Sequence, residues 1–360
     1  MKSFPLEASI EQLGSRVTAH PRLLPIGARS KPALSHRGDY ELLTVESLSG
    51  VLEYQPSEFT FTALAGTRLE TVDHMLAEHG QFLPFDPPLV ERGATLGGTV
   101  AAGLSGSGRY RFGGARDFLL GVKFLDGNGS LVRAGGKVVK NSAGFDIPKL
   151  MVGSLGYFGA LVELSFKVFP RPAEYATLIR SYPSLDEALQ QLSRLSTAPL
   201  DLFCLDLVPQ DGKADLIVRI GGLPESFPGR FERLGGLLGG GETLQGLPEI
   251  ELWRTVREFA WVPEHTRTVK VPLTPQRIPP LDSFLSEHNA LRRYSVAGNL
   301  AWVAWPGELQ ALDQRLSDLQ LSGLTVLGPP GHTRLGLRTA ASFVRRIKQA
   351  LDPQGRWVEV

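Results

Sequence analysis

The sequence contains a single cysteine, Cys204, among its 360 residues. One thiol cannot form a disulfide within the chain, and it cannot supply the ligands of a zinc ribbon or of a cysteine-bound iron–sulfur cluster. Because Cys204 lies in the apolar run LDLFCLDLV, we predict that its thiol is buried and unreactive.

Long apolar runs and charge of one sign are also scarce. No stretch reaches the roughly 18 apolar residues of a membrane-spanning helix, and the N-terminal residues MKSFPLEASIEQL lack the apolar core of a signal peptide. The net charge is +1, without a block of one sign. We therefore expect a cytoplasmic protein that binds no nucleic acid and that associates with a membrane only through partners.

The usual motifs of self-sufficient catalysis are missing as well. No G-x-G-x-x-G follows a strand, because GSLGYFG (Gly153–Gly159) has another spacing and precedes one. No P-loop, H-E-x-x-H or G-x-S-x-G occurs, and the histidines do not cluster with the spacing of metal ligands. If the protein is an enzyme, we expect a bound cofactor to carry its chemistry.

Glycine, in contrast, is abundant in one region. Seventeen of the 40 glycines fall between Gly93 and Gly159, interleaved with apolar, strand-like runs. Such density allows the backbone to approach a ligand closely or to adopt positive φ, and it favours a binding site for a large, flat or polyanionic ligand. The alternative is that these glycines only make turns, as DGNG (Asp126–Gly129) does.

Two segments have the pattern of anion-binding loops. PIGARSK (Pro25–Lys31) follows a short apolar strand, and its freed backbone N–H groups, with Arg29 and Lys31, can form an anion cradle. In TLGGTVAAG (Thr95–Gly103), Thr95 is a suitable N-cap, and paired glycines would let a phosphate approach exposed backbone donors.

Periodicity indicates an α+β fold. It predicts helices at Leu6–Arg16, at Arg68–His79 with Thr67 as cap, and at Ala341–Leu351. A hairpin is predicted around the DGNG turn, and Pro170–Pro172 is the clearest boundary. Strands and covering helices follow that boundary. We predict three regions: 1–172, an α+β domain at 173–326, and a closing segment at 327–360.

Seven segments in this order carry a family resemblance: PIGARSK, ALAGTRL, DPP, ATLGGTVAAGLSG, RDFLLGVKFLDGNG, VVKNSAGFD and VGSLGYFGALVELSFKVFPRP. They resemble the FAD-binding domain of the p-cresol methylhydroxylase / vanillyl-alcohol oxidase (PCMH-type) superfamily, from about residue 20 to 172 and more weakly to the end. Within it, the chain is most similar to the E subunits of bacterial glycolate oxidase. The resemblance implies a two-subdomain FAD-binding domain followed by a smaller α+β cap-like domain.

The resemblance also implies which residues contact FAD. The loops at 25–31 and 94–98 would surround the pyrophosphate, residues 99–103 and 140–146 would face the flavin and ribityl chain, and residues 153–159 with Val162 would border the adenosine. Lys140 would lie at the flavin N1–C2=O edge or on the surface, and Arg116 would face the cofactor or form an ion pair with Asp117. The full set is Pro25, Gly27, Ala28, Arg29, Ser30, Lys31, Pro88, Ala94, Thr95, Gly97, Gly98, Ala101, Gly103, Arg116, Lys140, Asn141, Phe145, Gly153, Gly156 and Val162.

The chain departs from the family pattern in three regions: the first loop, the tail and the cap half. The first loop reads GARSK instead of a G-x-G-T type sequence, and it contains no histidine; with Cys204 remote, we expect FAD to be bound non-covalently. The tail lacks the Asn-Pro-Gly found after LDP in relatives, and the cap half lacks a histidine-rich substrate motif. Only His332 and Arg334 form a candidate pair for a carboxylate substrate; the alternative, which the notion of a substrate site has to overcome, is a loop histidine and a salt-bridged arginine.

Three functions remain open from the sequence. In the first, which the resemblance implies, the chain would be an FAD subunit of a glycolate (2-hydroxy acid) oxidase or dehydrogenase complex, with a sister FAD subunit and an iron–sulfur subunit as partners. Alternatively, it is a non-catalytic flavin-binding scaffold in such a complex. The third possibility is an FAD-dependent oxidoreductase of another branch, acting on an aryl alcohol or a sugar.

Overall fold

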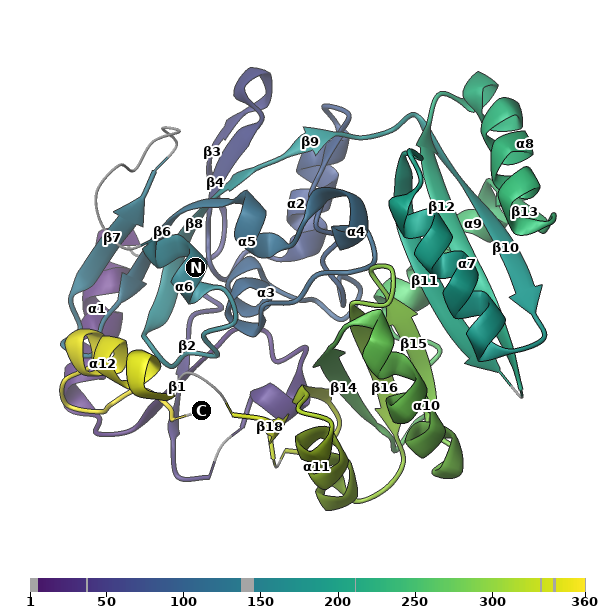
Figure 1. The fold of residues 1–360 in the computed structure, drawn as a ribbon. Helices are drawn as coiled ribbons and strands as arrows, with labels where there is room; N and C mark the ends of the chain where they lie inside the picture. The colour runs from purple at the N-terminus through teal and green to yellow at the C-terminus, as the bar shows by residue number, and fades with distance from the viewer. Residues whose placement is uncertain are drawn as a thin grey trace. The chain divides into compact units, whose positions relative to one another are not determined.

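The fold is described from a computed structural model, which covers residues 6–36, 38–136, 146–210, 212–330, 332–338 and 341–359. The chain forms two compact units. Unit 1 comprises residues 1–105, 114–170 and 339–360, and unit 2 comprises residues 106–113 and 171–338. Each unit combines sheet and helix (Figure 1), so the predicted α+β class is confirmed.

Unit 1 contains an antiparallel sheet of five strands in the order β3-β4-β8-β6-β7. Its strands are β3 (Val51–Gln55), β4 (Thr60–Leu64), β8 (Ala160–Lys167), β6 (Leu119–Leu125) and β7 (Leu131–Gly135). The carboxylate of Asp126 closes the β6–β7 turn by accepting hydrogen bonds from the backbone N–H groups of Asn128 and Ser130, both at 2.9 Å. The predicted hairpin is therefore confirmed.

Unit 1 also contains a parallel pair of strands, and the segment PIGARSK begins within the first of them. The pair consists of β1 (Leu23–Ile26) and β2 (Glu41–Thr44). The C-terminal tail runs parallel on the other side of β1 through a bridge between Leu23 and Trp357. Asp352 fixes this tail, because its carboxylate accepts from the backbone N–H groups of Arg356 at 2.9 Å and Trp357 at 2.8 Å. The tail lacks the Asn-Pro-Gly of the family pattern, and here the carboxylate of Asp352 holds it in place through these two hydrogen bonds.

The remaining elements of unit 1 are short. They are α1 (Leu6–Ala19), α2 (Leu69–Ala77), β5 (Gln81–Phe82), α3 (Leu96–Ala102), α5 (Ala115–Phe118), α6 (Ile147–Met151), β9 (Phe169–Pro170) and α12 (Ala341–Leu351). The predicted helices at both ends of the chain are confirmed. The predicted cap of α2 is wrong: the Thr67 hydroxyl donates to the backbone O of Gly50 at 3.1 Å instead, and Arg68 occupies the N-cap position.

Unit 2 is built on one sheet of nine strands in the order β13-β10-β12-β11-β15-β16-β14-β17-β18. Strand pairing is antiparallel throughout. The strands are β10 (Glu174–Tyr182), β11 (Leu202–Gln210), β12 (Lys213–Gly222), β13 (Glu242–Gln245), β14 (Arg267–Pro272), β15 (Leu291–Ser295), β16 (Leu300–Trp305), β17 (Ser322–Leu327) and β18 (Arg334–Gly336).

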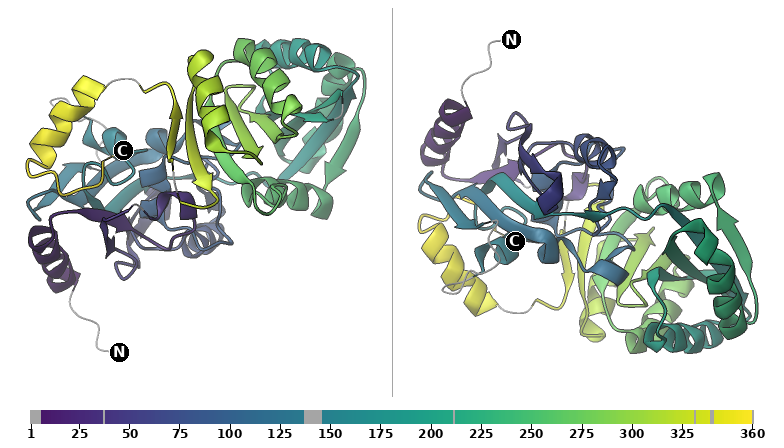
Figure 2. Two further views of the ribbon diagram at one scale, coloured as in Figure 1. Left: turned by 90° about the horizontal axis from the view of Figure 1, so that it is seen from below. Right: turned by 90° about the horizontal axis from the view of Figure 1, so that it is seen from above.

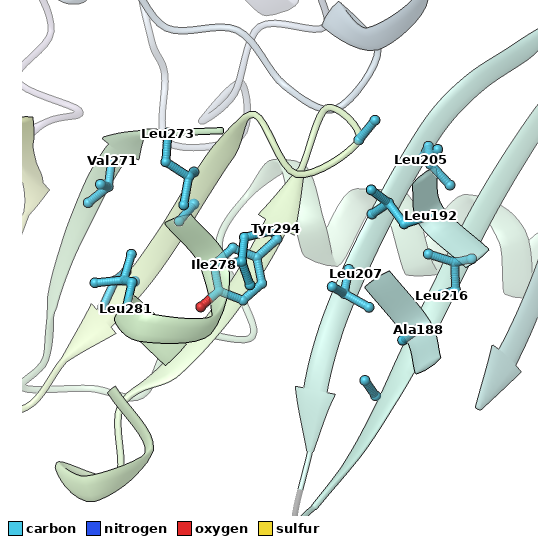
Figure 3. Close-up of a cluster of buried hydrophobic side chains, with 14 of the residues drawn as sticks. Ala188, Leu192, Leu205, Leu207, Leu216, Val271, Leu273, Ile278, Leu281 and Tyr294 are labelled. Atoms are coloured by element: carbon cyan, nitrogen blue, oxygen red, sulfur yellow. The ribbon is translucent and has the colours of Figure 1, made fainter. Parts of the chain in front are cut away.

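Helices cover both faces of this sheet (Figure 2). The large core contains side chains of α7 (Leu185–Thr197), α8 (Phe227–Leu238), α10 (Ile278–Glu287) and α11 (Leu309–Asp318). Figure 3 shows part of it, where Leu192 lies near Leu205 and Leu216, and Ile278 lies near Tyr294. A second cluster joins α9 (Leu247–Arg257) to the sheet and contains Cys204, which is buried as predicted.

The two units divide the chain differently from the three predicted regions. Residues 106–113, with the short helix α4 (Arg109–Phe112), belong to unit 2; there Ser107 Oγ donates to the carboxylate of Asp206 at 2.6 Å. Residues 327–338 also remain in unit 2, since β18 pairs with β17. No helix in the described parts of the chain is long and apolar enough to cross a membrane.

Candidate binding pocket at the end of strand β1

A pocket in unit 1 opens where β1 ends. Its walls come from β1, the loop that follows, α3 and the residue at position 155. The space at this site is about 580 Å³ with its open mouth included. The lining residues are Leu24, Pro25, Ile26, Gly27, Ala28, Arg29, Ser30, Lys31, Leu34, Ser35, Thr95, Gly98, Ala101, Ala102 and Leu155.

The loop after β1 presents unused backbone donors. Pairing with β2 ends where the Val45 N–H donates to the backbone O of Ile26 at 2.9 Å. Beyond that point, the described residues provide no acceptor for the backbone N–H groups of residues 28–30. Arg29 has a left-handed φ of 56°, a conformation that is uncommon outside glycine. Successive N–H groups in a loop with such a residue form a concavity suited to an anion.

Gly27 allows this loop to approach α3. A Cβ at position 27 would lie 2.5 Å from Oγ1 of Thr95, closer than any real contact. Thr95 is itself fixed, because its hydroxyl caps α3 by accepting from the Gly98 N–H at 3.2 Å. The predicted N-cap is therefore confirmed, and the cap also forms the surface on which the loop rests.

Lys31 brings a buried positive charge to the pocket. Its exposed fraction is only 5%. The ammonium donates to Ser30 Oγ at 3.1 Å, and burial lowers the pKa of Lys31 to about 8. The described residues provide no carboxylate to pair with it. A buried lysine without a carboxylate is unfavourable unless an anion binds beside it.

The first turn of α3 does not offer the donors that the sequence suggested. Its N–H groups are used within the protein: Leu96 donates to Thr67 O at 2.9 Å, Gly97 to Ala65 O at 2.8 Å, and Gly98 to Thr95. The expectation of exposed donors in this turn is therefore not met. The loop at 28–30 has the unused donors instead.

The two neighbouring glycines of α3 have different surroundings. A Cβ at Gly97 would meet Cβ of Ala65 at 2.7 Å, so this position serves close packing of α3 on the end of β4. A Cβ at Gly98 would point into the pocket, 3.8 Å from Nζ of Lys31. Of the pair, only Gly98 lines the pocket.

Several other predicted residues lie behind the pocket or away from it. The backbone N–H of Gly153 donates to Val100 O at 2.9 Å, and Gly103, in a left-handed conformation, packs against Gly153. Gly156 packs against Pro25. Pro88, Ala94 and Val162 are buried in unit 1 and do not line the pocket.

Part of the set predicted near the flavin ring lies outside the described residues. These residues are Lys140, Asn141 and Phe145. Arg116 and Asp117 are exposed; Asp117 caps α5 by accepting from the Gly114 N–H at 2.8 Å. A hydrogen bond and ion pair with Lys149 lower the pKa of Asp146, and Arg116 adds to this. The Arg116 role stays a prediction.

The candidate substrate pair, His332 and Arg334, lies in unit 2. Both residues are exposed, and Arg334 belongs to β18. The backbone O of His332 accepts from Thr325 Oγ1 at 3.0 Å. Neither residue lines the pocket, whose walls come from unit 1 alone. Their catalytic role stays a prediction.

Sequence reasoning missed part of the lining. The missed residues are Leu24, Leu34 and Ser35, whereas Ile26, Ala102 and Leu155 lie in segments that were predicted to contact FAD but were not named individually. Alternation in β1 could have indicated that one of its faces meets a ligand. Leu155 belongs to the predicted segment 153–159; its N–H donates to Ala101 O at 2.8 Å, and its φ is 53°.

Unit 2 contains a buried polar cluster of its own. The carboxylate of Asp206 accepts from Ser107 at 2.6 Å, from Nε of Arg293 at 2.7 Å and from Ser295 at 2.9 Å. Nearby on the sheet, burial and then the charge of Arg109 lower the pKa of Lys270 to about 8. Because Asp206 compensates Arg293 and holds residue 107, we interpret this cluster as structural.

Known proteins share both the sequence and the fold of this chain. Residues 16–135 match a family model described as FAD binding domain. The chain is 37% identical over 246 residues to glycolate oxidase subunit GlcE of Escherichia coli (strain K12), covering 68% of this chain and 69% of that relative. Glycolate oxidase subunit GlcD of Bacillus subtilis (strain 168) is 29% identical over 169 residues, which are 47% of this chain and 36% of that protein.

Two further comparisons agree. D-2-hydroxyglutarate dehydrogenase of Xanthomonas citri pv. viticola is 31% identical over 172 residues, which are 47% of this chain and 36% of that enzyme. Alkyldihydroxyacetonephosphate synthase shares the fold, with a TM-score of 0.67 and 15% identity, over 97% of this chain and 73% of that one. The chain thus spans about a third of the length of the GlcD and dehydrogenase relatives.

The fold is that of an FAD-binding flavoprotein of the PCMH type. The chain belongs to the family of GlcE-like glycolate oxidase subunits. It is an FAD-dependent oxidoreductase, and FAD is its cofactor. The pocket fits this cofactor: Lys31 and the donors at 28–30 suit a diphosphate, and Leu24, Ile26 and Leu155 provide apolar walls.

Proposed function

We propose that this chain is the FAD-binding subunit of a glycolate oxidase complex, and that its FAD receives or relays electrons from a small 2-hydroxy acid. The pocket at the end of β1 carries the proposal. It combines a buried lysine without a carboxylate partner with unused backbone donors. A relative named as a glycolate oxidase subunit supports the substrate class.

Each part of the pocket has a role in this proposal. The N–H groups of residues 28–30 and the Lys31 ammonium would bind the diphosphate. Gly27 and Gly98 leave room beside them, and the apolar walls would bind the adenosine side. When bound, FAD supplies the capacity to accept a hydride. The protein would hold FAD in position and would shield its diphosphate from water.

In the proposed complex, electrons leave this chain for another subunit. The sequence has a single cysteine, and Cys204 is buried in unit 2, so the chain cannot hold a cysteine-bound cluster. An iron–sulfur subunit is therefore proposed as acceptor, together with a sister flavin subunit resembling GlcD. Any membrane association would come through these partners.

An anaerobic half-reaction tests the proposal. The chain is purified alone and with the two partner subunits, and its visible spectrum is recorded before and after glycolate is added. Bleaching in the complex that accounts for the flavin of this chain as well as that of the sister subunit supports the proposed role. D-lactate and D-2-hydroxyglutarate serve as comparison substrates, since relatives are named for both. A complex that no 2-hydroxy acid reduces, but that an aryl alcohol or a sugar does, would instead favour another branch.

A scaffold role is the second candidate. It is favoured by the exposure of His332 and Arg334, because a substrate carboxylate is usually held by partly buried charges. In this case the flavin of the isolated chain would bind normally, yet remain oxidised in the complex while the sister subunit is reduced. Selective removal of FAD from this chain would then leave turnover unchanged.

A further inference from the structure

Lys31 has an uncompensated charge in a place where compensation is normally required. The ammonium has three donors, and the described residues supply one acceptor, Oγ of Ser30 at 3.1 Å. Ser30 is neutral, so it satisfies one hydrogen bond without balancing the charge. Two other buried cations of the chain have carboxylate partners: Lys348 pairs with Asp352 and Arg293 with Asp206, both at 2.7 Å.

Among the described residues, none near Lys31 could take over this balance. Among the lining residues, Arg29 is the only other ionisable side chain, and it is exposed and positive. Strand β1, helix α3 and Leu155 contribute no titratable side chain. His36, the next ionisable residue along the described chain, is exposed and does not line the pocket. The balancing negative charge must therefore come from a ligand.

The position of the ammonium indicates which part of a ligand it meets. Nζ of Lys31 lies 3.8 Å from the position that a Cβ on Gly98 would occupy. In the sequence, Lys31 comes directly after residues 28–30, whose backbone N–H groups are unused. A dianionic group in this corner would contact the donors and the ammonium together. In FAD, only the diphosphate has this charge.

We propose that Lys31 neutralises the FAD diphosphate, and that FAD binding fixes this lysine in its protonated form. The inference rests on the proposed function of the pocket as the FAD site. It makes Lys31 a specificity residue, since it distinguishes flavins that carry a diphosphate from riboflavin. It also couples cofactor binding to the uptake of a proton.

The coupling has a defined sign. In the free chain, burial lowers the pKa of Lys31 to about 8, and a bound dianion raises it again. FAD affinity is therefore constant below about pH 8. Above that pH it falls by up to about tenfold per pH unit, until the pH exceeds the pKa of the bound state.

Isothermal titration calorimetry of the FAD-depleted full chain measures this coupling directly. FAD is titrated at about pH 6.5 and about pH 8.5, in two buffers with different ionisation enthalpies. We expect uptake of roughly three-quarters of a proton at the higher pH and close to none at the lower one, from a free-state pKa of about 8. ADP should behave like FAD, whereas riboflavin binding should show no such uptake.

Two substitutions assign the proton. Lys31→Arg keeps the charge at every pH, so it should retain FAD binding while losing the proton uptake. Lys31→Met should lose the uptake and weaken both FAD and ADP by about tenfold or more at neutral pH. Lys213→Met, at an exposed lysine of β12, is the control and should change neither. Circular dichroism verifies that each variant is folded.

The outcomes separate this inference from the function on which it rests. FAD binding without proton uptake at about pH 8.5 in the unmodified chain would overturn the role of Lys31 and leave the FAD site intact. Full FAD affinity in Lys31→Met would overturn that role as well. If the unmodified chain binds no FAD at either pH, the proposed function of the pocket fails first.

Discussion

The hydroxyl of Thr95 stands where a side chain at position 27 would begin: a Cβ on Gly27 would lie 2.5 Å from Oγ1 of Thr95. The same oxygen accepts from the backbone N–H of Gly98 at 3.2 Å. One hydroxyl therefore caps α3 and sets how closely the loop after β1 can approach it. The geometry of the pocket depends on this contact.

Gly27→Val should displace the loop from α3. Because the cap holds Thr95 in place, the loop must move, and we expect FAD affinity to fall roughly tenfold or more. Fluorescence titration with FAD measures the loss. Gly229→Ala in α8, where a Cβ would meet nothing within 4 Å, is the control. Full affinity in Gly27→Val would show that the loop accommodates the side chain without affecting the site.

The neighbouring glycines of α3 should respond differently to substitution. Gly97→Ala places a Cβ 2.7 Å from that of Ala65, so it should lower the free energy of unfolding by about 1–3 kcal/mol. Gly98→Val fills the pocket beside Lys31, so it should release FAD while much of the fold survives. Thermal unfolding and flavin content, measured on both variants, check the division. Equal effects on both readouts in both variants would contradict it.

The pH dependence of stability in the FAD-free chain should reveal Lys31. Its pKa is about 8 in the folded state and 10.5 at its ordinary value, so the unfolded chain binds more protons between these pH values. Stability therefore rises with pH over this window, by about 3 kcal/mol from this residue. Lys31→Met removes that contribution. At neutral pH, it should stabilise the FAD-free chain even though it weakens cofactor binding.

Denaturant unfolding at several pH values tests this expectation, with Lys213→Met as the matched control. A lysine that only supports the structure would give the opposite result, since its replacement would destabilise the chain at every pH. The combination of higher stability and poorer cofactor binding is specific to a charge held for a ligand.

FAD should be bound without a covalent link. The pocket lining contains neither histidine nor cysteine, and Cys204 is buried in unit 2. Acid precipitation of the purified holo-protein should therefore release all of the yellow colour into the supernatant. Colour that remains with the pellet would show a covalent attachment.

The isolated chain should oxidise glycolate poorly, even when FAD is fully bound. Hydride transfer requires a clamped carboxylate and a base within hydrogen-bond reach, and complete orientation contributes on the order of 7–11 kcal/mol. His332 and Arg334 are both exposed and offer little positioning. Co-expression with the sister flavin subunit and the iron–sulfur subunit should restore activity. Rapid bleaching of the isolated chain by glycolate, abolished by His332→Ala, would identify a complete half-reaction enzyme instead.

Local sequence determined the elements whose signals lie within a few residues. The helix at Ala341–Leu351, the Thr95 cap and the hairpin closed by Asp126 all form as predicted. Each depends on contacts between residues at most four positions apart or on a regular apolar period. The sequence predicts the loop PIGARSK as an anion-binding segment for the same reason, because the sequence alone shows a short strand followed by a glycine and two cations.

Only the tertiary structure decided what these elements contact. Gly97 and Gly98 are equivalent in the sequence, and Ala65, more than 30 positions away, makes one a packing residue and leaves the other to the pocket. Thr67 was expected to cap a helix, yet its hydroxyl bonds Gly50, 17 positions earlier. Lys31 could have been a surface lysine; its burial against α3 makes its charge depend on a ligand. Such outcomes follow from long-range packing, which no local pattern encodes.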